Sequence, residues 1–223
     1  MFGAYVVAPT QAATFIVPTV SSAAYVQFSD SPFVAVDFSG GYFHLENFED
    51  DLLNTRGATA SGGSIIGFED FGGAVDSVDA DDGVVDGSGT TGGILGRSYF
   101  GGTSTFNFSA ALLGNLPTHA GIVWTDGGSA LYSLEAFDQN GVSLGVATGA
   151  SHADGSISGT TAEDRFYGVT HSGGISRIVL ISGGSLESDH LQYGYVPIPE
   201  PSSALLLLSG LALCLRRRFI GLN

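Results

Sequence analysis

Glycine clusters interrupt this chain so often that short strands are the elements it can most readily form. The 223 residues include 34 glycines, and the apolar runs of the body, from Ala24 to Tyr193, are short and end at glycine-rich turns. Apolar runs of about four to eight residues between turn signals are typical of β-strands, whereas helices need roughly ten or more. No stretch of the body combines a 3.6-residue period with capping residues. The sequence therefore predicts an all-β fold.

Several local patterns support this interpretation. Thr105–Ser109 alternates with the period of two that a half-buried strand requires. Asn140 and Gly141 lie between two apolar runs, and this pair is typical of a type I′ hairpin turn because both positions accept positive φ. Ser109–Leu116 is interpreted as one helical turn or a loop that ends at Pro117. Strands are expected at Ala24–Phe28, Phe33–Phe38, Tyr42–Phe48, Ser64–Phe68, Thr105–Ser109, Gly121–Trp124, Leu131–Phe137, Val142–Val146, Arg165–Thr170, Ile175–Ile181 and Asp189–Tyr193.

Many short strands joined by glycine turns favour an antiparallel β-sandwich, jelly-roll-like in its topology. The glycine-rich stretches Gly57–Gly63 and Gly83–Gly102 are expected to be loops at one end of the sandwich. We expect one domain over residues 14–195, a linker over residues 196–201, and a membrane helix with its arginine-rich end over residues 202–218.

The body is strongly acidic. The chain has a formal charge of −15, and because Arg216–Arg218 supply three of its seven positive side chains, the remainder carries about −18. Such a surface argues against nucleic acid and anionic lipid as partners and favours calcium or neutral sugars. Hydrophobic residues make up 43% of the chain, which is enough for a packed core. The only cysteine, Cys214, lies in the tail, so the body has neither a disulfide nor a thiol nucleophile.

The segment from Val196 to Asn223 differs from the body. A Pro-Glu-Pro triplet (Pro199, Glu200, Pro201) precedes an uncharged apolar run, Ser202–Leu215, and then Arg216, Arg217 and Arg218. The prolines keep the triplet extended, the apolar run can enter lipid only as a helix, and the arginines resist translocation. At 1.5 Å per residue this helix would be roughly 21 Å long, against a hydrocarbon core of ~30 Å. A transient membrane stop fits this length better than an ordinary permanent anchor, which is the alternative.

This arrangement resembles the PEP-CTERM sorting signal of Gram-negative bacteria. In that family the triplet, the short transmembrane helix and the arginine-rich end are recognised by exosortase, a processing enzyme of the membrane. The resemblance implies export, a membrane-anchored precursor, and delivery to the cell surface or extracellular matrix of a cell that makes exopolysaccharide and biofilm. The body stretches DSVDADDGVVDGSG and LPTHAGIVWTDG also look like secreted PEP-CTERM proteins, a likeness that implies no particular activity.

Residues 1–13, MFGAYVVAPTQAA, end in small residues like a signal-peptidase site but lack a basic start. We interpret them as the remnant of a signal peptide whose start lies upstream. A disordered or edge-strand N-terminus is the alternative.

The densest candidate metal site is a run of aspartates in one loop. Asp76, Asp79, Asp81, Asp82 and Asp86 fall within one short glycine-containing stretch. Carboxylates on such a loop suit Ca²⁺, which takes about six to eight oxygen ligands. The stretch departs from an EF-hand loop because Val78 and Ala80 stand at ligand positions and no glutamate closes it. The alternative is a solvated acidic loop without metal.

A second candidate calcium site lies where the first and last strands of a jelly roll would meet. Many sugar-binding jelly rolls hold a structural calcium there, and this likeness of architecture suggests Glu46, Glu49 and Asp189 as alternative ligands. Solvated carboxylates at strand edges are the ordinary interpretation of the same residues.

Sugar binding would combine an exposed aromatic ring with polar neighbours. Trp124 with Asp126 is the candidate ligand-binding pair, although Trp124 ends an apolar run and also fits a core position, and Tyr99 with Phe100 is a second candidate. A glycosidase would need a pair of carboxylates, and the chain offers too many candidates to single one pair out: Glu135, Asp138, Glu163, Asp164, Glu187 and Asp189. The histidines lack HExxH spacing and no Gly-x-Ser-x-Gly occurs, so we predict no catalytic residues and no enzyme.

The sequence therefore predicts an exported surface or matrix protein whose body is a structural or adhesive β-sandwich, with calcium as its candidate ligand. A carbohydrate-binding module of the exopolysaccharide matrix is the first alternative, and a secreted glycan-active enzyme is the second.

We predict that the native host cleaves the chain near Pro199–Pro201. The intact mass of the surface protein should then lack the segment that carries Arg216–Arg218. Replacing these three arginines by glutamine should impair processing, because their charge is the barrier that holds the tail in the membrane. A surface protein that retains the arginines would contradict cleavage.

Overall fold

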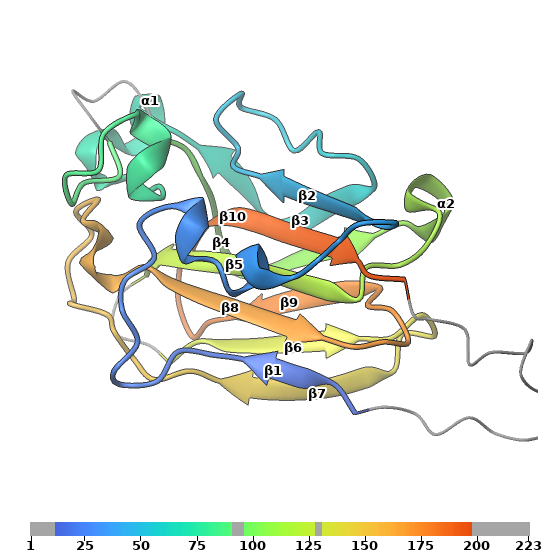
Figure 1. The fold of residues 1–223 in the computed structure, drawn as a ribbon. Coiled ribbons are helices and arrows are strands. Elements are labelled where there is room, and N and C mark those ends of the chain that lie inside the picture. Colours follow the sequence, from blue (N-terminus) through green and yellow to red (C-terminus); the bar gives the residue numbers. More distant parts are fainter. Residues whose placement is uncertain (1–11, 91–95, 128–130, 198–223) are drawn as a thin grey trace, which may run out of the picture.

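The structure, a computed structural model, describes residues 12–90, 96–127 and 131–197, which form antiparallel strands and short helical turns (Figure 1). The predicted antiparallel all-β class is confirmed. The strands are β1 (Thr14–Ile16), β2 (Tyr42–Glu46), β3 (Ala58–Ile66), β4 (Ser98–Phe108), β5 (His119–Asp126), β6 (Ser133–Phe137), β7 (Ser143–Thr148), β8 (Arg165–Thr170), β9 (Arg177–Ile181) and β10 (Leu186–Tyr195). The helical turns are α1 (Phe68–Phe71), α2 (Ala110–Leu113), η1 (Phe28–Asp30), η2 (Pro32–Ala35), η3 (Gly72–Ala74), η4 (Asp79–Asp82) and η5 (Thr161–Glu163).

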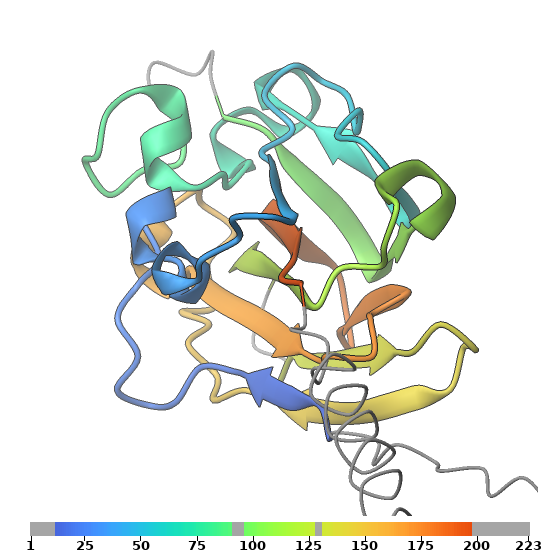
Figure 2. The same cartoon turned by 45° about the vertical axis from the view of Figure 1, so that its right-hand side comes forward.

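The strands belong to one hydrogen-bonded sheet that is nearly barrel-like. Its order is β1-β8-β5-β10-β4-β9-β6-β7, with β2 added to β10 and β3 added to β4. The two ends of this order, β1 and β7, lie close together in both views (Figures 1 and 2). Just beyond these strands, the Ala150 amide donates to the Pro18 carbonyl at 2.8 Å. A Cβ on Gly145 of β7 would lie 3.3 Å from the Phe15 ring of β1.

The core follows from the alternation of side chains along the strands. Leu134 and Ala136 of β6 are buried between less buried neighbours, as are Ile178 and Leu180 of β9. Phe106 of β4 is also buried, which agrees with the alternation of Thr105–Ser109. These inward side chains fill the inside of the curved sheet.

The segments Ala24–Phe28 and Phe33–Phe38 were predicted as strands, and this is wrong: they consist of irregular backbone and parts of the 3-10 turns η1 and η2. The Asp30 carboxylate accepts the amides of Val26 and Gln27 at 3.0 and 3.1 Å and closes the first turn. Ser31 caps the second turn at the Phe33 amide, and Pro32 has no amide to give to a strand partner. The apolar side chains here serve packing, because Tyr25 and Phe33 cover Val123 and Phe166 on the sheet.

Of the two glycine-rich stretches expected as loops, Gly57–Gly63 lies mostly in β3, whereas Gly83–Gly102 enters a strand only at its end, where β4 begins at Ser98. Gly63 and Gly101 face each other in this pair, next to a bulge at Ser61/Gly63. A Cβ on Gly63 would lie 2.3 Å from the Phe100 carbonyl oxygen, and one on Gly101 would lie 2.2 Å from the Gly62 carbonyl oxygen. The glycines therefore permit a close backbone approach, which the sequence alone does not distinguish from a loop.

The hairpin predicted at Asn140 and Gly141 is present between β6 and β7, but its turn type differs. Only Gly141 of the pair has positive φ, at 74°. The Asp138 carboxylate accepts the Asn140 and Val142 amides at 2.8 and 2.9 Å, while the Gly141 amide donates to the Asp138 carbonyl. Side-chain capping by Asp138 thus replaces the type I′ geometry. The helical turn expected within Ser109–Leu116 is α2.

Three parts of the expected sorting signal lie outside the described residues: the Pro-Glu-Pro triplet, the apolar run Ser202–Leu215 and Arg216–Arg218. Nearly all of the expected signal-peptide remnant also lies outside them. Within the three described ranges, no helix has the length and apolar character needed to cross a membrane.

We predict that Gly101→Ala destabilises the protein by about 2 kcal/mol or more, because the new methyl group overlaps the Gly62 carbonyl in a packed strand pair. Gly102→Ala is the matched control, since its Cβ would meet nothing nearer than the Gly184 carbonyl oxygen at 3.9 Å. Its expected effect is within about 0.5 kcal/mol. Urea denaturation measures both, and equal losses would contradict the close approach of β3 and β4.

Candidate functional site

Three adjacent strands carry acidic residues at the same end of the sheet. Asp126 is the last residue of β5, Asp164 immediately precedes β8, and Glu187 is the second residue of β10. β5 pairs with both of the other strands, and Glu187 lies opposite Asp126 in the ladder. Because antiparallel neighbours alternate in direction, the end of β5 meets the starts of β8 and β10.

Two loop segments close over this end and add more carboxylates. The segment that follows α1 meets the segment before β8 through reciprocal main-chain contacts: Gly89 donates to the Gly159 carbonyl and Gly159 to the Gly73 carbonyl, both at 3.1 Å. This contact brings Asp76 and Glu163 to the strand ends, at the left in Figure 1. We name the resulting group the sheet-end cluster: Asp76, Asp126, Glu163, Asp164 and Glu187.

Main-chain amides hold two members of the cluster in place. The Asp76 amide donates to Glu187 Oε2 at 2.7 Å, and the Asp154 amide donates to Glu163 Oε2 at 2.7 Å. Thr125 anchors the loop at the Asp76 carbonyl oxygen, 2.8 Å away. The Asp126 carboxylate accepts the Gly127 amide and lies within hydrogen-bonding reach of Glu163. Hydrogen bonds therefore fix the carboxylates of Asp126, Glu163 and Glu187 at the strand ends.

Two members of the cluster are buried without any hydrogen-bond partner. The side chains of Asp76 and Asp164 are fully inaccessible to solvent, and neither oxygen of either carboxyl has a partner among the described residues. Leaving a buried polar group unsatisfied costs about 1–3 kcal/mol, and more when the group is charged. These four oxygens are the strongest anomaly of the described structure.

The electrostatics of the cluster follow from burial and mutual repulsion. Burial, followed by the charge of Glu187, raises the pKa of Asp76 well above its ordinary range, and burial with the charge of Asp76 does the same for Asp164. Burial also raises the pKa values of Glu163 and Glu187 to about 8. The nearby Arg165 does not neutralise them by direct bonds, because its Nη1 donates to the main-chain carbonyls of Ala162 and Asp164.

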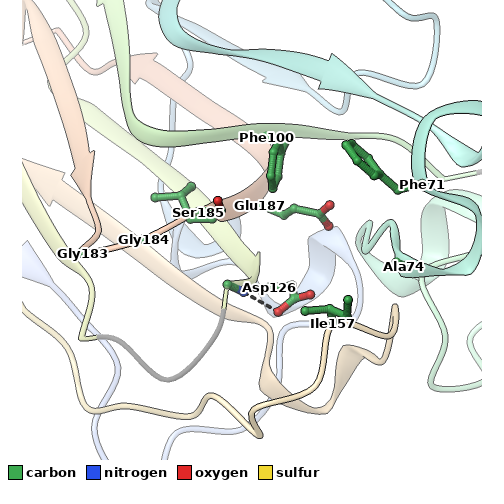
Figure 3. A pocket seen from close by; sticks show the side chains of 11 residues that line it. Phe71, Ala74, Phe100, Asp126, Ile157, Gly183, Gly184, Ser185 and Glu187 are labelled. Atoms are coloured by element: carbon green, nitrogen blue, oxygen red, sulfur yellow. Dashed lines mark hydrogen bonds between the residues drawn. The ribbon is translucent and has the colours of Figure 1, made fainter.

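An apolar cleft lies directly against the cluster (Figure 3). It has a volume of about 490 Å³. Phe71 and Phe100, with ring centroids 5.6 Å apart, form one wall, and Ile157 lies opposite them. Phe71 is 55% exposed and Ile157 71% exposed. The carboxyl groups of Asp126 and Glu187 point into the space between these walls (Figure 3), so the cleft joins apolar walls to an acidic floor.

The structure does not bring the five loop aspartates together at one point. Asp79 accepts the amides of Asp86 and Gly87 and the Thr161 hydroxyl, so it organises its own loop. Asp82 is buried and accepts the Val84 amide, whereas Asp86 is exposed and accepts the Ser88 amide. Of the five, Asp76 alone belongs to the sheet-end cluster, and Asp81 lies in a different group.

Asp81 joins Asp189 and His190, whose potential ligand atoms lie within 4.8 Å of one another. This group is already hydrogen-bonded. His190 Nε2 lies 2.9 Å from Asp81, and His190 Nδ1 lies 3.0 Å from the Tyr25 hydroxyl. Because Gln192 donates to the Tyr25 oxygen at 2.9 Å, the tyrosine proton is free to bond Nδ1, and the Nε2 proton then faces Asp81. Asp189 accepts Ser77, Val78 and its neighbouring amide, so these residues form a satisfied network.

The alternative calcium ligands Glu46 and Glu49 are also used as anchors. Glu46 accepts the amides of Phe48, Asn54 and Thr55 and the Thr55 hydroxyl. Glu49 accepts the amides of Gly96 and Arg97, and burial raises its pKa to about 7. Both carboxylates hold loops at the sheet edge, and neither belongs to the sheet-end cluster.

The two side chains of the proposed sugar-binding pair, Trp124 and Asp126, lie in different surroundings. Trp124 is fully buried, stacks on Tyr132 with centroids 4.4 Å apart, and donates its indole N–H to the Asp126 carbonyl at 2.8 Å. It is a core residue here, whereas Asp126 reaches the cleft and the cluster. Of the second aromatic pair, Phe100 lines the cleft and Tyr99 is buried.

Sequence reasoning did not single out Glu163, Asp164 and Glu187 from the other acids. The available signal was their position just before predicted strands: Glu163 and Asp164 precede the strand that begins at Arg165, and Glu187 precedes the one that begins at Asp189. It could not be used without knowing that β8 and β10 are both neighbours of β5. No family model, curated protein or solved structure matches the chain, so the chemistry of these residues is the guide to function.

We predict that the metal-free protein loses stability as the pH rises from about 6.5 to about 8.5. Glu163 and Glu187 have folded pKa values of about 8, against about 4.3 when unfolded. Between these values the folded state holds protons that the unfolded state has released, so the free energy of unfolding falls with pH.

The measurement is the Tm in chelator across this range, which should fall by several degrees. Glu163→Gln should flatten the decline, whereas Glu135→Gln, on the hairpin strand β6, should leave it unchanged. A Tm that rises with pH would contradict the burial of these carboxyls.

Proposed function

We propose that this chain is an exported surface protein whose β-body binds a neutral saccharide in the cleft beside the sheet-end cluster. The likeness of the tail to a PEP-CTERM signal supports a membrane-anchored precursor that exosortase processes. The jelly-roll-like sandwich expected from the sequence stays a part of this proposal. Exopolysaccharide of the surrounding matrix is the natural source of the ligand.

The observation that carries the proposal is the exposed aromatic wall over two carboxyl groups. Sugar rings present C–H faces that pack on aromatic rings, and hydroxyls that donate to carboxylates. Phe71 and Phe100 offer the aromatic rings, and Asp126 and Glu187 offer the carboxyl groups. The cleft volume of about 490 Å³ lies within the range of small-ligand sites, roughly 300–1,000 Å³.

Charge selects the class of saccharide. The chain carries a formal charge of −15, and the cleft floor is acidic. An acidic polysaccharide would be repelled unless cations intervened, so uncharged sugar units fit best. The structural or adhesive role predicted for the body would then be exerted through polysaccharide.

We predict that Phe71→Ala and Phe100→Ala each weaken saccharide binding by about tenfold, since loss of one stacking face costs on the order of 1 kcal/mol. Phe68→Ala is the matched control, because Phe68 is also exposed on α1 but does not line the cleft. Its affinity should equal that of the unsubstituted protein.

A glycan array followed by calorimetry on the full-length chain measures these affinities. No saturable binding to any neutral glycan would contradict the proposal and leave a purely structural body. Release of reducing ends would instead indicate a glycan-active enzyme.

A further inference from the structure

We propose that the sheet-end cluster, Asp76, Asp126, Glu163, Asp164 and Glu187, binds a calcium ion that joins two loops to the ends of β5, β8 and β10. This site differs from the run of loop aspartates and from Glu46, Glu49 and Asp189. It does not depend on saccharide binding in the cleft.

The first support is the state of Asp76 and Asp164. Both side chains are fully buried, and all four carboxyl oxygens lack hydrogen-bond partners among the described residues. The charges that act most strongly on Asp76 are those of Glu187, Asp126 and Glu163, which all belong to the cluster. Buried carboxylates persist when they are paired or coordinate a metal, and these two have no ion-pair partner in the described ranges.

The second support is the charge balance. Five ionised carboxylates and the Arg165 guanidinium together carry a formal charge of −4. The ion pairs of Arg97 with Asp51 and Glu69, and the hydrogen-bonded contact of His190 with Asp81, do not involve Asp76 or Asp164. A divalent ion would supply two positive charges to the group.

The third support is the arrangement of the hydrogen bonds around the cluster. Main-chain amides occupy one oxygen of Glu163 and one of Glu187. Such outer contacts are typical of carboxylates that a protein holds in place around a metal. The main chain thus holds two of the proposed ligands in position.

The donor set selects calcium. It consists entirely of oxygen atoms, and no cysteine or histidine belongs to it. Calcium accepts about six to eight oxygens in flexible geometry, with carboxylates binding through one or both oxygens. Magnesium demands a tighter octahedron and keeps several waters, which a closed cluster of carboxylates does not suit. The Asp81, Asp189 and His190 group is a poorer site because hydrogen bonds already satisfy it.

Terbium luminescence tests the site directly on the full-length chain. Trp124 is the only tryptophan, and its ring donates to the main chain of Asp126, so Tb³⁺ in the cluster should be sensitised by indole excitation. Calcium should displace it saturably, and magnesium should need at least a tenfold higher concentration. Asp76→Asn and Asp164→Asn should each weaken Tb³⁺ and Ca²⁺ binding at least tenfold. The control Asp86→Asn, an exposed aspartate of the same loop, should bind as the unsubstituted protein does.

Thermal unfolding separates a ligand role from a merely structural one. Millimolar Ca²⁺ should raise the Tm of the unsubstituted protein, because an ion that binds only the folded state stabilises it. In chelator, Asp76→Asn should be as stable as the unsubstituted protein or more so, since a buried charge is removed, yet its Tm should not respond to Ca²⁺. If Asp76→Asn does not fold, Asp164→Asn carries the same test.

Three outcomes would overturn the site. They are no saturable response to Ca²⁺, an equal response to Ca²⁺ and Mg²⁺, and loss of the response on Asp81→Asn but not on Asp76→Asn. Failure of saccharide binding with the calcium response intact would overturn the proposed function alone.

Discussion

The structure depends on how five carboxylates are accommodated at one end of the sheet. Asp126, Asp164 and Glu187 reach this end because they terminate or begin adjacent strands, and Asp76 and Glu163 arrive on the loops that cover it. Burial and mutual repulsion disfavour the ionised forms. How firmly both loops are held therefore depends on what neutralises the cluster, protons or a cation.

This constraint also shapes the cleft. Asp126 and Glu187 belong to the cluster and point into the cleft, and Phe71 lies on α1, at the start of one covering segment (Figure 3). We expect that an ion bound by the cluster would hold this segment against the strand ends and so set the distance between the aromatic wall and the acidic floor. Ion binding and ligand binding are thus expected to be linked through shared residues, because anything that orders the loop orders both.

Much of the fold was predictable because local patterns determine it. Arg165–Thr170 was predicted with its observed bounds, and the hairpin at Asn140 and Gly141 was found where two apolar runs meet. The errors have a common cause. Ala24–Phe38 has the composition of strands but packs as capped turns, and the glycines of β3 and β4 serve close strand contact instead of loops. Composition alone does not reveal which backbone will lie beside a glycine or which side chain will cap an amide.

The sequence by itself determined the β-class, the approximate positions of most strands, and an acidic body without a disulfide. It also showed that oxygen-rich residues gather near Asp76 and near Asp189. Only the tertiary structure decided which acids meet. Asp76 and Glu187, 111 residues apart, are joined by a hydrogen bond, and Asp126 and Glu187 face each other through the register of β5 and β10. A cluster of this kind depends on strand order and loop closure, and these are properties of the whole packed chain that no local pattern encodes.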